Sequence, residues 1–175
     1  MSSIAIEQDA DSVKLAIAVH QNAALSKVRL VKARLNSKLG PDAGSGEIDV
    51  SFHFKTKLVE LGAEALRFEI QFRMAGLRGI VPEEIVGVDC TFEAVYDLRP
   101  DFVVTKEMVE AFQKGNAIFN VWPYFREYLQ SSLTRMGYPP LVAPFLVLKP
   151  KRAKHKVQVD QVPAKRLTGT SKAKA

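Results

Sequence analysis

Four stretches of this chain alternate between apolar and polar residues with a period of two, and this pattern is the feature that most limits its fold. In the clearest stretch, 65–77, the even positions from Leu66 to Met74 are apolar, and the odd positions between them are charged or amide residues. Successive side chains of a strand point to opposite faces, so the pattern predicts half-buried antiparallel strands with one polar face. The four predicted strands span 27–39, 47–61, 65–77 and 87–99.

The connections between these stretches agree with a sheet. Residues 40–46 read GPDAGSG, a composition typical of a flexible link, and residues 60–64 are short enough for a hairpin loop. Within the first stretch the apolar residues change phase between Leu30 and Val31. Because a shift of one residue exchanges the two faces of a strand, we expect a β-bulge at this point.

Two segments outside the predicted strands have the spacing and end signals of short helices. Residues 9–24 follow helical spacing, and Asp9, Asp11 or Ser12 is suited to cap the helix. Residues 106–114 follow Thr105 as a capping residue and end at a glycine. Helices therefore flank the predicted sheet on both sides in the sequence.

A longer helix is predicted over 120–136. Asn120 is suited to the N-cap, Pro123 would then lie in the first turn, and Gly137 suits the position after the last turn. Its apolar stripe consists of Val121, Trp122, Phe125, Leu129, Leu133 and Met136. The expected fold class is therefore α+β: a four-stranded antiparallel sheet with the long helix packed on one face, an extra N-terminal helix and a basic C-terminal tail.

The positive charge of the chain is confined to its end. Residues 149–175 hold seven Lys and two Arg against one acid, Asp160, whereas the preceding 148 residues hold 16 basic and 18 acidic residues. The whole chain carries a net charge of +6, so the body is slightly acidic and only the tail is basic. A basic tail binds polyanions without reading their sequence, and nucleic acid is expected as a partner only in this non-specific way.

No pattern in the chain predicts an enzyme. His20, His53 and His155 lie far apart, without cysteines or carboxylates at ligand spacing, so neither a metal site nor another cofactor is expected. The single cysteine, Cys90, excludes an intramolecular disulfide and suits a reducing compartment. The longest apolar run near the N-terminus, 15–19, is too short for a signal peptide or a membrane span, which predicts a cytoplasmic protein.

Aromatic residues are dense at the start of the long helix. One helix buries one stripe on a sheet, and Tyr124 and Tyr128 stand beside that stripe. Surplus apolar area of this kind indicates an oligomer interface or a binding groove. The candidate groove residues are Phe119, Val121, Trp122, Tyr124, Phe125 and Tyr128. The candidate interface residues are Tyr124, Tyr128 and Arg135.

Trp122 has two interpretations. As a core residue its ring is buried against the sheet, and its indole N–H finds a partner near the start of the helix. As a groove residue it contacts a ligand instead. Core packing is the competing interpretation for Phe125 as well.

The same helix resembles a known family, the SecB protein-export chaperones. The motif consists of NVWPYFRE at 120–127, then Gly137, Pro139 or Pro140, and VAPFL at 142–146. Residues 90–95, CTFEAV, resemble the fourth strand of that family. The resemblance covers about 26–148, which is expected to be the SecB-like domain; 1–25 would form an N-terminal helical extension, and 149–175 a basic, flexible tail.

This resemblance implies a chaperone that holds unfolded polypeptides in apolar grooves without ATP. It also implies a homo-oligomer assembled as a dimer of dimers, with clients passed to the translocase motor SecA. SecB-like chaperones that protect the antitoxin of a toxin–antitoxin system are similar in body, so an antitoxin is an alternative partner. Two functions of a different kind also stay open: polyanion binding through the tail, and ligand binding in an α+β protein whose aromatic residues line an enclosed cavity.

Overall fold

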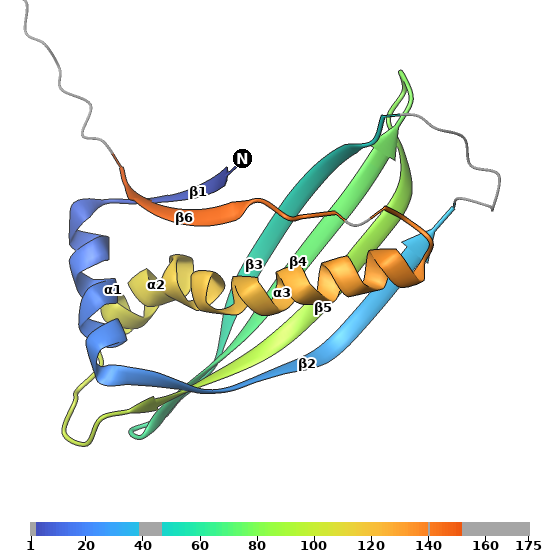
Figure 1. Ribbon diagram of the computed structural model, residues 1–175. Helices are drawn as coiled ribbons and strands as arrows, with labels where there is room; N and C mark the ends of the chain where they lie inside the picture. The colour runs from blue at the N-terminus through green and yellow to red at the C-terminus, as the bar shows by residue number, and fades with distance from the viewer. Residues whose placement is uncertain (1–2, 39–46, 140, 152–175) are drawn as a thin grey trace, which may run out of the picture.

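A computed structural model describes residues 3–38, 47–139 and 141–151 and confirms the α+β class (Figure 1). Long strands form a sheet, and a long helix runs across one side of it. In chain order the elements are β1 (Ser3–Gln8), α1 (Ala10–Asn22), β2 (Ala23–Ser37), β3 (Asp49–Leu61), β4 (Ala65–Arg78), β5 (Glu83–Leu98), α2 (Lys106–Lys114), α3 (Asn116–Arg135) and β6 (Phe145–Pro150).

The main sheet is antiparallel throughout and has the strand order β2-β5-β4-β3. The expected hairpin between β3 and β4 is present, and the amide of Gly62 donates to the carbonyl of Ala65 at 2.9 Å. The expected bulge is present as well, as a register shift between Leu30 and Lys32. The alternation in the sequence therefore predicted both the strands and the irregularity in β2.

The capping signals of the two shorter helices are also confirmed. The amide of Ser12 donates to the carboxylate of Asp9 at 2.9 Å, so Asp9 is the N-cap of α1 among the three residues proposed. The amide of Met108 donates to the hydroxyl of Thr105 at 3.3 Å at the start of α2. In each case a side-chain oxygen satisfies a backbone amide that the helix itself leaves free.

The start of the long helix differs from the sequence prediction. Helix α3 begins at Asn116, directly after Gly115, and Pro123 lies inside it. Asn120 is therefore not its N-cap. Instead, the side-chain amide of Asn120 donates a hydrogen bond to the hydroxyl of Tyr96 at 3.3 Å. Ala117 and Ile118 are buried in the core, and their burial offsets the backbone hydrogen bond that the proline removes.

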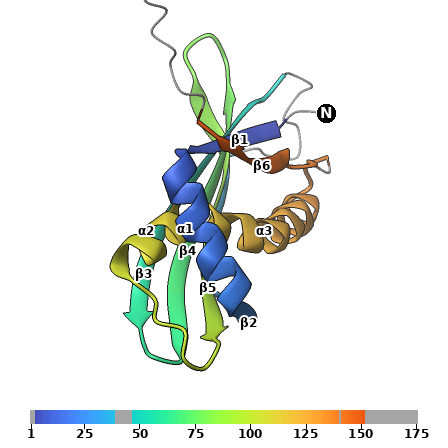
Figure 2. The same cartoon turned by 90° about the vertical axis from the view of Figure 1, so that its left-hand side faces the viewer.

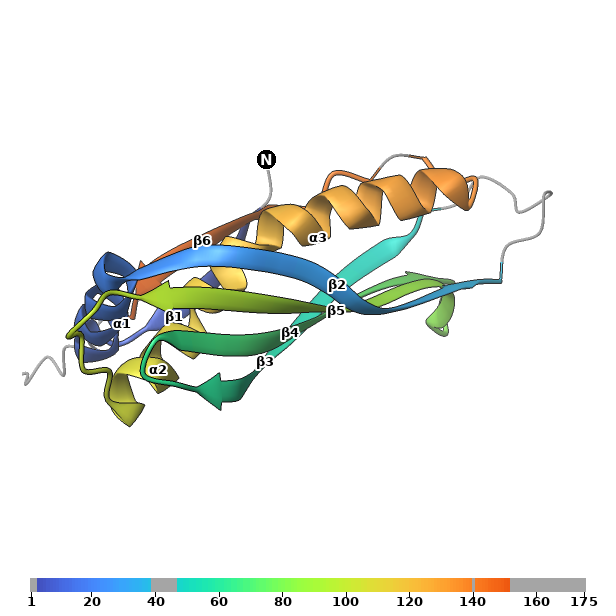
Figure 3. The ribbon, with the colours of Figure 1, turned by 90° about the horizontal axis from the view of Figure 1, so that it is seen from below.

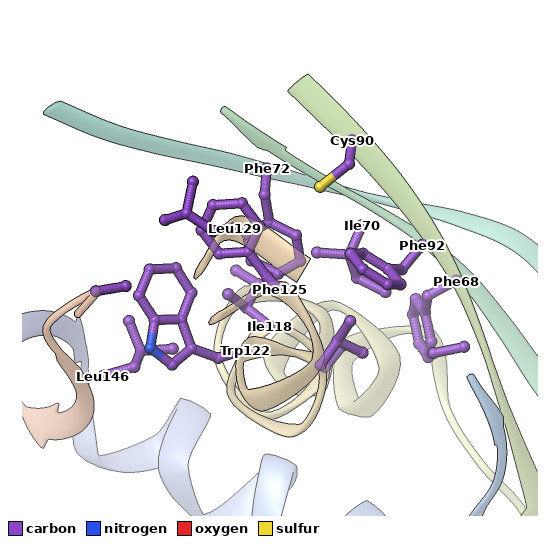
Figure 4. Packing of buried hydrophobic residues seen from close by; sticks show 14 of the residues in the cluster. Phe68, Ile70, Phe72, Cys90, Phe92, Ile118, Trp122, Phe125, Leu129 and Leu146 are labelled. Atoms are coloured by element: carbon purple, nitrogen blue, oxygen red, sulfur yellow. The ribbon is translucent and has the colours of Figure 1, made fainter. Parts of the chain in front are cut away.

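Helix α3 packs on the central strands through aromatic side chains (Figure 4). Phe125 stacks on Phe72 of β4 with ring centroids 4.7 Å apart, and the rings of Trp122 and Phe52 also meet around this pair. Helix α2 continues the layer, because Phe112 packs edge-on against Tyr96. The core therefore lies between one face of the main sheet and the helices α2 and α3.

Two strands were not predicted. β1 and β6 pair in parallel, from Ser3 opposite Phe145 to Gln8 opposite Pro150, and form a small separate ribbon (Figure 2). The buried Gln8 amide donates to the carbonyl of Ala111 at 2.8 Å and so ties the ribbon to α2. A β-carbon at Gly115 would lie 2.8 Å from the Gln8 side-chain oxygen, so glycine is needed where α2 meets α3.

This ribbon crosses the boundaries expected from the sequence. It joins the predicted N-terminal extension, 1–25, to the end of the predicted SecB-like domain, and β6 continues two residues past the expected end of that domain at 148. The division of the chain into 1–25, 26–148 and 149–175 stays a prediction. Most of the predicted basic tail, 152–175, lies outside the described residues.

The stacked pair in the core predicts the effect of two matched substitutions. Phe125→Ala should lower the free energy of unfolding by about 3–5 kcal/mol, because it removes a fully buried ring and leaves a cavity. Phe119→Ala, in the same helix but at an exposed position, should cost about 1 kcal/mol or less. Urea unfolding followed by circular dichroism measures both, and equal losses would contradict this packing.

Candidate functional site

Strand β2 carries an apolar strip on the same side of the sheet as the helices. Leu30 pairs with Phe92 and Leu35 pairs with Val88, and in both pairs the β5 partner is buried in the core. Helix α3 packs on β3, β4 and β5, however, and Leu30, Val31 and Leu35 stay 40–44% exposed. This strip is therefore one part of the helix-side face that α3 leaves open; Leu61 on β3, which pairs with the buried Leu66, is exposed as well.

One flank of α3 borders this strip. Along that flank the side-chain amide of Asn120 donates a hydrogen bond to the hydroxyl of Tyr96 in β5. Tyr128 lies one turn after Tyr124, and its ring contacts Phe92 edge-on with centroids 6.4 Å apart. Because Phe92 is the strand neighbour of Leu30, this flank faces the β2 side of the sheet. Tyr124 is 47% exposed there, and Tyr128 is half-buried. We call Leu30, Val31, Leu35, Tyr124 and Tyr128 the β2–α3 apolar surface.

Three of the six predicted groove residues belong to the core. Val121, Trp122 and Phe125 are at most 3% exposed, because they occupy the stripe of α3 that faces the strands. In the described part of the chain these three side chains are not accessible at the surface, and their assignment to a binding groove stays a prediction. The core interpretation of Trp122 is confirmed by its burial.

The hydrogen-bond partner of the Trp122 indole is not in the first turn of α3. The indole N–H donates to the carbonyl of Pro144 at 3.0 Å, just before β6, and Figure 4 shows the ring beside Leu146. The indole therefore attaches the segment leading into β6 to the long helix. A buried indole N–H needs such a partner, and tertiary contacts supply it here.

Phe119 lies apart from the two tyrosines. It is 44% exposed and lies on the same face of α3 as Arg126, seven residues later, whose guanidinium sits 4.9 Å from the ring centre of Phe145 in β6. This flank faces the β1–β6 ribbon, whereas Tyr124 and Tyr128 face β2. The structure thus separates the predicted groove residues into a core set and two surface flanks.

Arg135, predicted at an oligomer interface, lies in the last turn of α3 and is exposed. It follows Tyr124 and Tyr128 at positions that share one face of a helix, so the three interface candidates form one row. The sequence prediction missed the strip on β2. The only sequence signal for this strip was the change of phase at Leu30 and Val31. That change predicted a bulge, but it did not predict which apolar residues the helix would leave uncovered.

The described residues bring together no group of three or more His, Cys, Asp or Glu side chains that would hold a metal ion. Within the same ranges, no helix is both long and apolar enough to cross a membrane. Burial raises the pKa of the Cys90 thiol to about 12, with a smaller effect from the neighbouring charge of Asp89. Burial likewise raises the pKa of the Tyr96 hydroxyl to about 12. Neither group is poised to ionise near neutral pH.

The described chain thus combines a four-stranded antiparallel sheet with an aromatic helix across one face, and this architecture can be compared with known proteins. No family model and no curated protein sequence matches the chain, but solved structures do. The structure of Mycobacterium tuberculosis Rv1957, a SecB-like chaperone in complex with a ChAD peptide from the Rv1956 HigA1 antitoxin, matches with a TM-score of 0.68 at 19% identity. The match covers 79% of this chain and 100% of that chain.

A weaker structural match is a protein of unknown function from Streptococcus agalactiae, with a TM-score of 0.37 and 7% identity over 70% of this chain and 97% of that one. The match with Rv1957 shows that the present chain has the SecB-like fold. The resemblance seen at residues 120–127 is therefore confirmed at the level of the fold.

The two raised pKa values predict how stability depends on pH. In the unfolded chain Cys90 ionises near its ordinary value of 9.0, whereas the folded protein keeps the thiol neutral up to a pKa of about 12. Stability is therefore fully present below about pH 9 and falls as the pH rises. We expect Cys90 alone to account for a loss of about 1–2 kcal/mol between about pH 9 and about pH 10.5.

Urea unfolding of the wild type and of Cys90→Ala at several alkaline pH values measures this loss. The variant should start from a lower stability but lose less of it as the pH rises. Parallel curves for the two proteins would show that the thiol ionises equally in the folded and unfolded states.

Proposed function

We propose that this protein is a chaperone that binds extended apolar segments of unfolded polypeptides without ATP. The observation that supports this proposal is the β2–α3 apolar surface, which combines exposed aliphatic residues on an edge strand with exposed tyrosines on the neighbouring helix. A client segment laid along this surface would bury its apolar side chains against Leu30 and Leu35. Aromatic side chains beside such a strip add contact area with little loss of conformational entropy.

A homo-oligomer is part of the same proposal. β2 is a long edge strand of the sheet, and an exposed apolar edge invites pairing with another chain. Pairing two copies through their β2 edges would use the backbone groups of the edge and leave the helix-side face for a client. We propose a dimer of dimers, with Tyr124, Tyr128 and Arg135 near the contacts between copies.

The similarity to Rv1957 favours an antitoxin as the dedicated client. That SecB-like chaperone was solved with an antitoxin peptide. We therefore propose a segment of an antitoxin as the preferred ligand of this protein. General export in the cytoplasm, with clients passed to SecA, is the alternative destination for the same binding surface.

Tyr124 and Phe119 allow a matched test of the binding surface. Both are aromatic, exposed to a similar degree and in the same helix, but they lie on different flanks. Tyr124→Ala should weaken the binding of a fluorescently labelled unfolded polypeptide about tenfold, because it removes an aromatic contact at the proposed groove. Phe119→Ala should bind within about twofold of wild type. Fluorescence anisotropy without nucleotide measures both affinities, and equal weakening would place the client elsewhere.

The choice of client is tested by competition. An antitoxin encoded beside the gene should displace the labelled polypeptide at a concentration at least about tenfold lower than an unrelated unfolded preprotein does. Equal displacement would favour a general holding chaperone over a dedicated one. Light scattering in the same buffer gives the mass of the free protein, and a monomer of 19.4 kDa at micromolar concentration would contradict the proposed oligomer.

A further inference from the structure

Figure 3 shows β2, β5, β4 and β3 next to one another, with α3 on one side of the sheet. The face of the main sheet away from α3 carries ordered rows of polar side chains. The strand register places neighbours on β2, β5, β4 and β3 side by side across this face. One row consists of Lys32, Thr91, Gln71 and Lys55. The next row consists of Arg34, Asp89, Arg73 and His53.

The acidic groups near these two rows are already paired. Both Asp89 and Glu84 bind the guanidinium of Arg73, at 2.9 Å and 2.6 Å. Lys32, Arg34 and Lys55 are exposed and form no salt bridge with any described residue. Within the described part of the sheet, three cations without an acidic partner therefore surround Arg73 and the two carboxylates that it binds.

These cations surround a shallow hollow of about 380 Å³. Its lining includes the hydroxyl-bearing Thr91 and the amide-bearing Gln71 from the central strands, and Lys32, Arg34 and Lys55 from the edge strands. Hydroxyl, amide, ammonium and guanidinium groups all donate hydrogen bonds, so the hollow is suited to accept an anion.

The positive excess is local. The preceding row consists of Arg29, Glu93, Glu69 and Lys57, in which the charges balance. Arg29 is held by Glu93 at 2.9 Å. We call Lys32, Arg34, Lys55 and the hollow between them the cationic patch.

We propose that the cationic patch docks an extended acidic segment of a partner protein, with carboxylates at alternate positions. On each strand the two rows are two residues apart, which is the spacing of side chains on one side of an extended chain. Carboxylates at positions i and i+2 of such a segment would therefore meet the two rows in turn. The proposal is independent of the proposed chaperone function, because this face lies opposite the β2–α3 apolar surface.

Nucleic acid fits the patch less well than an acidic segment. The two rows contain no phenylalanine, tyrosine or tryptophan, and Phe54 and Phe72, which also line the hollow, pack in the core. The patch therefore presents no aromatic ring on which the bases of a single strand could stack. The basic end of the chain, 149–175, has the same sign of charge as the patch and is excluded as its occupant by repulsion. The charge of the patch is complementary to an acidic protein segment.

The test uses the full chain and a fluorescein-labelled peptide of alternating glutamate and serine. The patch variant is Lys32→Glu with Lys55→Glu. Its matched control is Lys27→Glu with Lys57→Glu, which changes the same two strands and the net charge equally but outside the patch. Both variants keep the basic tail, so a difference between them reports the sheet face alone.

We expect the patch variant to bind the peptide at least about tenfold more weakly than wild type, and the control to bind within about twofold. Added salt should weaken the wild-type interaction. The patch variant should also bind a peptide of alternating lysine and serine more tightly than the control does, which shows that it is folded and has reversed its preference.

Three results would overturn the proposal. Equal loss in both variants, or no loss in either, would assign the binding to general charge or to the tail. If a peptide with the same number of glutamates in one block bound with the same affinity as the alternating peptide, the proposed preference for carboxylates at alternate positions would be wrong. Tighter binding of single-stranded DNA than of the acidic peptide, lost in the patch variant alone, would make the partner a nucleic acid.

Discussion

The packing of α3 across the sheet is the interaction on which the rest of this structure depends. The stack of Phe125 on Phe72 places the helix over β3, β4 and β5, and Trp122 extends the contact toward β6. A helix is about 10–12 Å wide and strands lie about 4.8 Å apart, so one helix covers only two or three strands. The fourth strand, β2, therefore keeps Leu30, Val31 and Leu35 at the surface.

The junction between α2 and α3 determines where the β1–β6 ribbon attaches to the helices. Gly115 lets the two helices follow each other with almost no loop and leaves room for the buried side chain of Gln8. Gln8 in turn anchors β1, and β1 pairs with β6, which the Trp122 indole holds through Pro144. Both ends of the described chain are thus fastened to the same helical layer.

The two faces of the sheet are separated in chemistry because alternate residues of each strand point in opposite directions. On β5, Cys90 and Phe92 enter the core, whereas Asp89 and Thr91 belong to the polar rows. An apolar ligand and an acidic ligand would therefore approach from opposite sides. Binding of one would not physically block the other.

The sequence by itself determined the four strands, the bulge in β2 and the caps of the short helices, and its resemblance to the SecB family indicated the fold. These features rest on local signals: side-chain alternation, and capping residues such as Asp9 and Thr105. Local signals also predicted a helix start at Asn120, but the helix begins earlier because burial of Ile118 outweighs the cost of Pro123. Propensity gives way to tertiary packing when the residues concerned lie in the core.

Only the tertiary structure decided which apolar residues are accessible. Trp122 and Tyr124 are neighbours in the aromatic run, yet one is buried and the other is half exposed, because the exposure of a helical residue depends on where the sheet lies. The pairing of β1 with β6 joins residues from opposite ends of the chain, and the cationic patch gathers residues from four strands. Contacts between residues so distant in sequence produce no periodic pattern in either segment. They therefore cannot be predicted from local sequence, because each segment contains only one of the two partners.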